Sequence, residues 1–203
     1  MKLILVILSS CFFFLQGCMR QQLRPREYMS WVKNEDHGLR VSKQIDDNTF
    51  TLQYKPCEYE ALLHTKNENI SQAALSTQVK SMQSLQYFTF CIKRADKKDP
   101  ASAQSVDESD YNNRLNYLMF DMQSDFELID GTDTLPCAFY HYERNYDLSP
   151  ENNILLGFEL PKKQKGIHDK TIIYSDQLLG TGRIQLTIKA EDIKRIPTLN
   201  LIP

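Results

Sequence analysis

The chain of 203 residues carries 24 basic and 26 acidic side chains, and its formal net charge is −2. This near balance argues against a nucleic-acid partner, because such a partner requires a clustered basic face. The length suits one domain, and a hydrophobic content of 41% with 10% aromatic residues is typical of a globular protein rich in strand-forming residues.

The N-terminal segment begins with the basic residue Lys2 and continues with an apolar run over 3–15. This pattern predicts a secretory leader rather than a folded element. The run is shorter than the roughly 17–25 apolar residues that cross a bilayer as a helix. An ordinary leader would end in a small-x-small site, whereas this one offers only Gly17 next to the cut. A soluble secreted form and a retained helix stay open as alternatives.

Residues Leu15, Gln16, Gly17 and Cys18 resemble the lipobox of bacterial lipoprotein precursors, and the Phe-rich leader looks like those of Bacteroidota lipoproteins. Gln16 stands where that motif usually has a small or β-branched residue. The resemblance implies that the leader over 1–17 is removed and that the thiol of Cys18 is diacylated, for example with palmitate. Each buried CH₂ contributes about 0.8 kcal/mol, so several chains anchor durably. We therefore expect a lipid-bilayer partner at the bacterial cell envelope, with the outer membrane favoured.

After the leader we predict a lipidated tether over 18–27 and a single domain over 28–203. Hydrophobic periodicity and turn residues divide the first part of this domain into helices and one hairpin. These elements are a short helix over 28–34, strands over 39–45 and 49–55, a short helix over 57–64, and a longer helix over 71–86 that Asn69 or Ser71 caps.

The middle of the chain predicts a buried strand between two amphipathic helices. Residues 87–92 are apolar on both alternating faces, which indicates a central strand covered on both sides. The charged segment 95–109 contains Pro100 and is typical of a mobile loop. Asp110 is placed to cap a helix that runs to about Gln123.

The last part of the chain is rich in β-strand patterns separated by turn residues. The predicted strands are 126–130, 135–146, 153–160, 170–175 and 183–189, followed by one helical turn at 190–195. We therefore predict an α+β fold, with a mostly antiparallel sheet or sandwich of about seven strands and two main amphipathic helices.

Three cysteines remain after removal of the leader with Cys11 and acylation of Cys18, namely Cys57, Cys91 and Cys137. Their spacings of 34 and 46 residues match no zinc or redox motif. Buried thiols are the favoured interpretation, and one disulfide stays open because an oxidising compartment permits it.

No sequence motif for catalysis or phosphate binding is present, and the best remaining group is His141 with Glu143. Their spacing places both on one face of a strand. A histidine oriented by a carboxylate acts as a general base, or binds zinc if a third ligand such as His37, His64 or His168 lies near. The favoured interpretation is a polar outer face of the strand.

Two further patterns have ordinary structural explanations. The acidic run of Glu35 and Asp36 before His37 offers metal ligands, but the favoured interpretation is a solvated loop before Gly38. The tyrosines around His141 suggest a recognition surface, although alternate residues of a strand must face inward.

The leading functional hypothesis is an envelope lipoprotein whose domain is a non-enzymatic interaction or scaffold module, for example an accessory component of a secretion or surface assembly. It implies a protein partner and no cofactor. The alternatives are an envelope hydrolase or metal-dependent enzyme that uses His141 and Glu143, and a small-ligand-binding lipoprotein with an apolar pocket between sheet and helices.

Overall fold

The computed structural model describes residues 21–65, 71–145, 148–162 and 166–201. The predicted leader and Cys18 therefore lie outside the described residues. Eight strands form one antiparallel sheet in the order β2-β3-β4-β7-β6-β5-β8-β9. The strands are β2 (Arg40–Ile45), β3 (Asn48–Lys55), β4 (Leu85–Arg94), β5 (Phe126–Asp130), β6 (Asp133–Glu143), β7 (Glu151–Glu159), β8 (Lys170–Ser175) and β9 (Arg183–Ile188).

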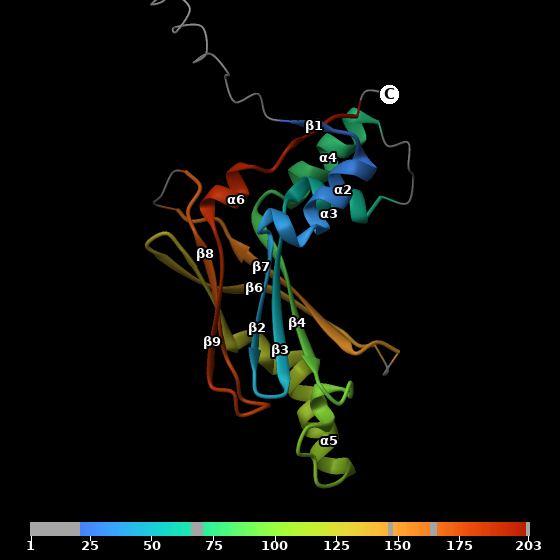
Figure 1. The fold of residues 1–203 in the computed structure, drawn as a ribbon, viewed down its shortest axis with the longest axis vertical. Helices are drawn as coiled ribbons and strands as arrows, with labels where there is room; N and C mark the ends of the chain where they lie inside the picture. Colours follow the sequence, from blue (N-terminus) through green and yellow to red (C-terminus); the bar gives the residue numbers. More distant parts are fainter. Residues whose placement is uncertain (1–20, 66–70, 146–147, 163–165, 202–203) are drawn as a thin grey trace, which may run out of the picture.

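The sheet curls around a single core, so that β2 and β9, at the two ends of the strand order, approach each other (Figure 1). Alternate residues of each strand point inward, as the period-2 pattern requires. The ring of Phe126 stacks on that of Tyr174 with centroids 4.8 Å apart, and Phe90 meets Phe126 edge-on at 5.1 Å. Each such buried side chain contributes about 1.5–3 kcal/mol. The expected α+β class with a mostly antiparallel sheet is confirmed, and the described sheet has eight strands rather than about seven.

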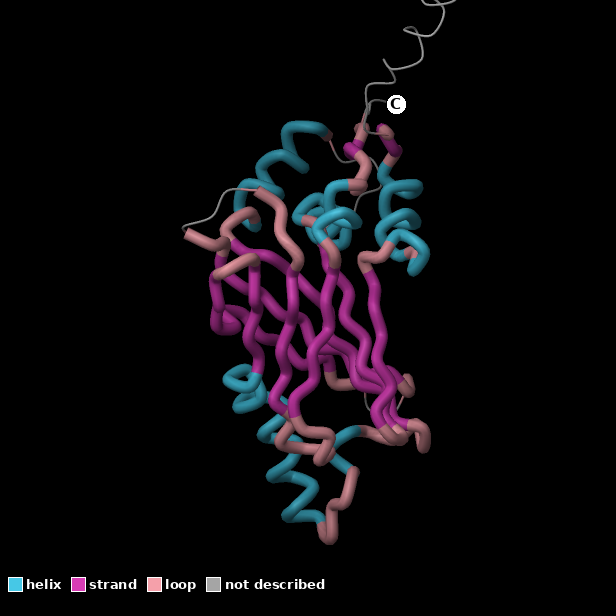
Figure 2. Tube along the Cα trace, turned by 60° about the vertical axis from the view of Figure 1, so that its left-hand side comes forward, coloured by secondary structure: helices cyan, strands magenta, loops and turns pink. Residues whose placement is uncertain are grey.

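The helices lie at the two ends of the sheet rather than on its faces (Figure 2). They are α2 (Pro25–Lys33), α3 (Cys57–Leu63), α4 (Gln72–Met82), α5 (Glu108–Asn116) and α6 (Ala190–Lys194). The end formed by α2, α3, α4 and α6 is the N-terminal pole, and the end formed by residues 95–125 with α5 is the distal pole. The two main predicted helices, α4 and α5, thus occupy opposite poles and do not flank β4 as the sequence suggested (Figure 1).

The ends of both main helices differ from the prediction. Helix α4 stops at Met82, and Gln86 belongs to β4. Helix α5 begins earlier than expected because the Asp107 carboxylate accepts the N–H of Asp110 at 2.8 Å and so provides the cap. The chain then continues as a π-helical turn over Tyr117–Asp121 and a 3-10 turn over Met122–Asp125.

The fold begins within the range assigned to the tether. Strand β1 (Gln22–Leu23) pairs in parallel with β10 (Thr198–Leu199), and helix α2 begins at Pro25. The N–H of Thr198 donates to the Gln21 carbonyl at 2.8 Å. Residues 22–27, which were expected to belong to the tether, are therefore part of the fold, because β1 pairs with β10 and α2 follows it.

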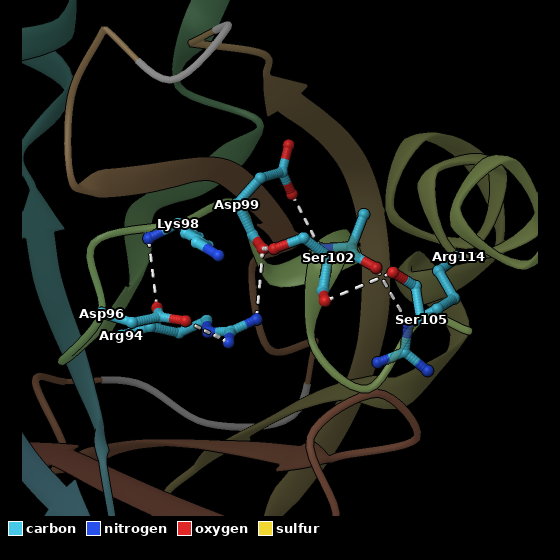
Figure 3. Close-up of polar contacts among 8 residues, drawn as sticks. Arg94, Asp96, Lys98, Asp99, Ser102, Ser105 and Arg114 are labelled. Atoms are coloured by element: carbon cyan, nitrogen blue, oxygen red, sulfur yellow. Dashed lines mark hydrogen bonds and ion pairs between the residues drawn. The ribbon is translucent and has the colours of Figure 1, made fainter. Parts of the chain in front are cut away.

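The segment 95–109, which was expected to be a mobile loop, is held by side chains that bind its backbone (Figure 3). Arg94 donates to the Asp99 carbonyl at 3.3 Å, and the buried Asp99 carboxylate accepts the N–H of Ala101 at 2.7 Å. Arg114 Nε donates to the Ala101 carbonyl at 3.0 Å. Composition alone did not reveal this order because two of the partners, Arg94 and Arg114, lie outside the segment.

Candidate functional site

A groove of about 680 Å³ opens at the N-terminal pole, between α4 and the C-terminal segment that follows β9. This volume lies within the range of about 300–1,000 Å³ that is usual for small-ligand sites. The strand end at Tyr54, the start of α3 and helix α4 form one side, while α6 and β10 form the other. We call this feature the N-terminal groove.

Helix α4 forms one wall of the groove with its apolar stripe. The hydroxyl of Ser71 caps the helix by accepting the N–H of Ala74 at 3.2 Å. Leu75 and Val79 follow at helical spacing and line the groove. Only Leu75 is buried, and α4 packs mainly against α3 rather than against the sheet. Much of the apolar stripe of α4 therefore remains available to the groove.

The opposite wall is built from the last described residues of the chain. Ile193 lies in the single turn of α6, and Ile196, Leu199 and Leu201 continue the apolar lining. Proline at 197 stops the helix, because it lacks the N–H needed for another turn. Pairing of β10 with β1 then holds this segment in place.

Tyr54 and Cys57 line the groove where β3 meets α3. Burial, followed by the nearby carboxylate of Glu58, raises the pKa of the Cys57 thiol. The thiol donates a weak hydrogen bond to the Leu85 carbonyl at 3.8 Å. A thiol held in its neutral form is a poor nucleophile.

A buried polar cluster lies at the same end of the sheet, inside the curl. Lys170 Nζ lies 2.6 Å from Asp130 Oδ2, and the amide of Gln86 donates to the same oxygen at 2.9 Å. All three residues are buried, and Gln86 Oε1 has no hydrogen-bond partner among the described residues. Buried charges are costly unless they are paired. The cluster therefore stabilises the end of the sheet next to the groove only while both charged partners are present.

His141 and Glu143 are both exposed, on the outward face of β6. The intervening Tyr142 is buried and donates to the Asn152 side chain at 3.3 Å, while Tyr140 donates to the Leu118 carbonyl. Neither His141 nor Glu143 lines the N-terminal groove. Alternation along β6 therefore places His141 and Glu143 on the outward face and turns Tyr140 and Tyr142 inward. These two tyrosines do not form an exposed recognition surface.

The other histidines named as possible metal ligands have partners of their own or lie in other loops. His37 stacks on Trp31 with ring centroids 4.0 Å apart, and its Nδ1 lies 2.8 Å from the Trp31 carbonyl. His64 Nε2 lies 3.7 Å from Glu60 Oε2, and His168 lies in the loop before β8. Within the described ranges no group of three or more His, Cys, Asp or Glu side chains is arranged to hold a metal ion.

The thiols of Cys57, Cys91 and Cys137 are all free, so none of the three is joined to another. Burial raises the pKa of Cys91 and that of Cys137 to about 11. Their thiols therefore stay neutral at physiological pH.

The sequence did not predict the N-terminal groove, because its two walls are more than a hundred residues apart along the chain. One signal was present in the sequence. The stripe of Leu75 and Val79 indicated an apolar helix face, but it did not reveal what the face would cover.

Among the described residues, no helix is both long enough and apolar enough to span a membrane.

Comparisons with known proteins give no family for this chain. No family model matches it, and no curated protein matches it. A protein of unknown function from Burkholderia pseudomallei covers 86% of this chain and 93% of its own at 13% identity, with a TM-score of 0.40. A DUF4426 family protein from Pseudomonas aeruginosa covers 73% of this chain and 90% of its own at 7% identity, with a TM-score of 0.31.

Proposed function

We propose that this protein is an envelope lipoprotein, anchored through acylated Cys18, whose domain binds a partner and catalyses no reaction. The observation that carries the proposal is the position of the lipobox-like residues 15–18 directly before the fold. Cys18 lies four residues before Gln22, the first residue of β1. An extended chain spans at most about 3.3–3.6 Å per residue, so β1 lies within about 14 Å of the lipid-bearing residue.

This short reach orients the molecule. Strand β1 lies at the N-terminal pole, beside α2 and α4 (Figure 1). An anchor at Cys18 would therefore turn that pole toward the bilayer and the distal pole away from it. The distal pole exposes Val106 and Phe120, at 86% and 67% of their full accessible area. Exposed apolar side chains of this kind suit contact with a protein partner.

The anchor is tested by mass spectrometry of the mature N-terminus together with membrane fractionation of the Cys18→Ser variant. We expect an N-terminal peptide that begins at acylated Cys18, and loss of membrane attachment in the variant. An intact leader, an unlipidated peptide, or equal fractionation of both proteins would contradict the proposal. Sucrose-gradient separation of the two membranes tests the preference for the outer membrane.

The interaction role is tested by affinity isolation of the tagged protein from solubilised membranes. A stoichiometric protein partner that is lost when Phe120 is changed to Glu supports the proposal, with Leu160→Glu as the matched control because Leu160 is 50% exposed and lies at the end of β7. Recovery of the protein alone counts against it.

A second candidate function is the binding of a small ligand in the N-terminal groove, which its volume and apolar walls favour. The enzyme alternative gains no support from the positions of His141 and Glu143, since both are exposed on the outward face of β6.

A further inference from the structure

We propose that the N-terminal groove binds the hydrocarbon chain of a long-chain fatty acid, an inference that rests on the ligand-binding function above and names its ligand class. Apolar side chains lie on both sides of the groove, with Leu75 and Val79 on α4 and Ile196 and Leu199 on the C-terminal segment, and polar side chains lie beside them. The apolar part of the lining suits hydrocarbon, because a polar group placed against these side chains would lose its hydrogen bonds to water.

Polar side chains such as Gln72, Ser76 and Thr198 also line the groove. Among the described lining residues only Lys80 on α4 and Glu58 on α3 are charged, and both are exposed. The ammonium group of Lys80 attracts a carboxylate, and the amide of Gln83 lines the groove and offers N–H donors to it. A single apolar chain with one anionic end matches this distribution of charge.

An extended peptide fits the groove less well than a hydrocarbon chain. Peptides commonly bind by adding a strand to an exposed sheet edge. The walls here are mainly helices and the irregular C-terminal segment; β3 contributes only its end at Tyr54, and β10 has two residues. A two-residue edge provides too few backbone hydrogen bonds to hold a strand.

The position of the groove indicates where its ligand comes from. Leu199 lines the groove and pairs with Leu23 of β1. With acylated Cys18 only four residues before Gln22, the groove stays close to the bilayer, where hydrocarbon chains are concentrated. Helix α4, which contributes only one buried side chain, is the wall best able to adjust to a chain.

The test uses a chain that begins at Met19, which retains every described residue and carries no lipid. Binding of the fluorescent fatty acid cis-parinaric acid, below its micelle concentration, is followed by its emission. We expect saturable binding with one site per chain. Val79→Glu places a carboxylate against the hydrocarbon and should weaken binding at least about tenfold. Val106→Glu, the same change at the distal pole, should leave binding unchanged.

Two further measurements separate the parts of the proposal. Ser76 is exposed and lines the groove, so Ser76→Phe fills it without removing a core contact and should also weaken binding. Lys80→Gln, or the methyl ester of the probe, should weaken binding by about two- to fivefold, as expected for an exposed ion pair. Circular dichroism and thermal unfolding establish that each variant is folded.

Absence of binding to the chain that begins at Met19 would overturn the proposal, as would an equal effect of Val79→Glu and Val106→Glu. The anchor itself is read separately, from the mass of the N-terminal peptide, so failure of the two proposals is distinguishable.

Discussion

At the distal pole, arginine side chains close the end of the sheet by binding backbone carbonyls, whereas at the N-terminal pole the loosely packed helix α4 borders a groove with apolar side chains on both sides. Arg114 joins two separate loops, because Nε donates to the Ala101 carbonyl at 3.0 Å and Nη2 to the Leu178 carbonyl at 2.6 Å. Helix α4, by contrast, buries only Leu75. Polar contacts thus hold the distal segment in one arrangement, while the N-terminal pole keeps apolar surface available for a ligand.

The largest expected effect tests the buried charges beside the N-terminal pole. Lys170→Met leaves the Asp130 carboxylate buried without its cation and should lower the free energy of unfolding by about 3–5 kcal/mol, measured by urea denaturation. The double variant Lys170→Met with Asp130→Asn removes both charges and keeps an oxygen for the Gln86 amide. It should recover most of the loss, and equal destabilisation of both variants would contradict the role given to the ion pair.

The next effect tests the polar closure of the distal pole. Arg114→Met removes both hydrogen bonds, so the carbonyls of Ala101 and Leu178 lose the arginine as their donor. The free energy of unfolding should therefore fall by about 2–3 kcal/mol. Limited proteolysis should then cut within 95–109 faster than in the parent chain. Arg183→Met is the matched control, because Arg183 is exposed and its nearest carboxylate contact is 4.0 Å long. If both variants are cut at the same rate, the distal closure does not depend on Arg114.

A smaller, pH-dependent effect is expected from Asp176, in the turn that Arg114 contacts. Burial alone would raise the pKa of Asp176, but hydrogen bonds from the Thr181 hydroxyl and N–H, and from the backbone N–H groups of Leu178 and Leu179, outweigh burial and lower it. The folded state therefore favours the carboxylate. Its stabilisation is complete above the ordinary pKa of 3.8 and is lost as the pH falls through the lower folded value.

Asp176→Asn should accordingly lower the free energy of unfolding by about 1–2 kcal/mol near neutral pH. The difference from the parent chain should shrink as the solution is acidified below the ordinary pKa of 3.8. Urea denaturation over a pH series measures it. A difference that stays constant with pH would show that the charge of Asp176 contributes nothing.

The smallest effect is expected on the outer face of the sheet, away from both poles. His141→Ala changes an exposed side chain and should alter the free energy of unfolding by less than about 0.5 kcal/mol. It should also leave binding of the fatty-acid probe unchanged. A large loss of either would require a contact of His141 that the described residues do not show.

Strand positions were the most predictable part of the fold. The strands 126–130 and 170–175 have the predicted bounds, since each is a short run of strand-forming residues between turn or breaking residues. The hairpin of β2 and β3 follows from alternation around its polar turn. These features depend on neighbours in the sequence, so the sequence carries the information needed to place them.

Helix ends and loop order were less predictable, because distant partners decide them. Gln86 fitted the stripe of α4 as well as a strand, and its bonds to Asp130 and to the Glu159 carbonyl place it in β4. The sequence around Gln22 and Leu23 shows no strand pattern. These residues form a strand because they pair with β10 in the folded chain. A local pattern sets a preference of a few tenths of a kcal/mol per residue, which a single buried contact exceeds.

The sequence by itself determined the α+β class, most strand positions and the pattern at 15–18 that led to the proposed anchor at Cys18. Tertiary structure alone decided that α4 and α5 close opposite poles, that His141 and Glu143 face outward, and that Val79 and Leu199 face one groove. The reason is physical: hydrophobic alternation records which side of an element is apolar, whereas the surface it meets is chosen only when segments distant in the chain pack together.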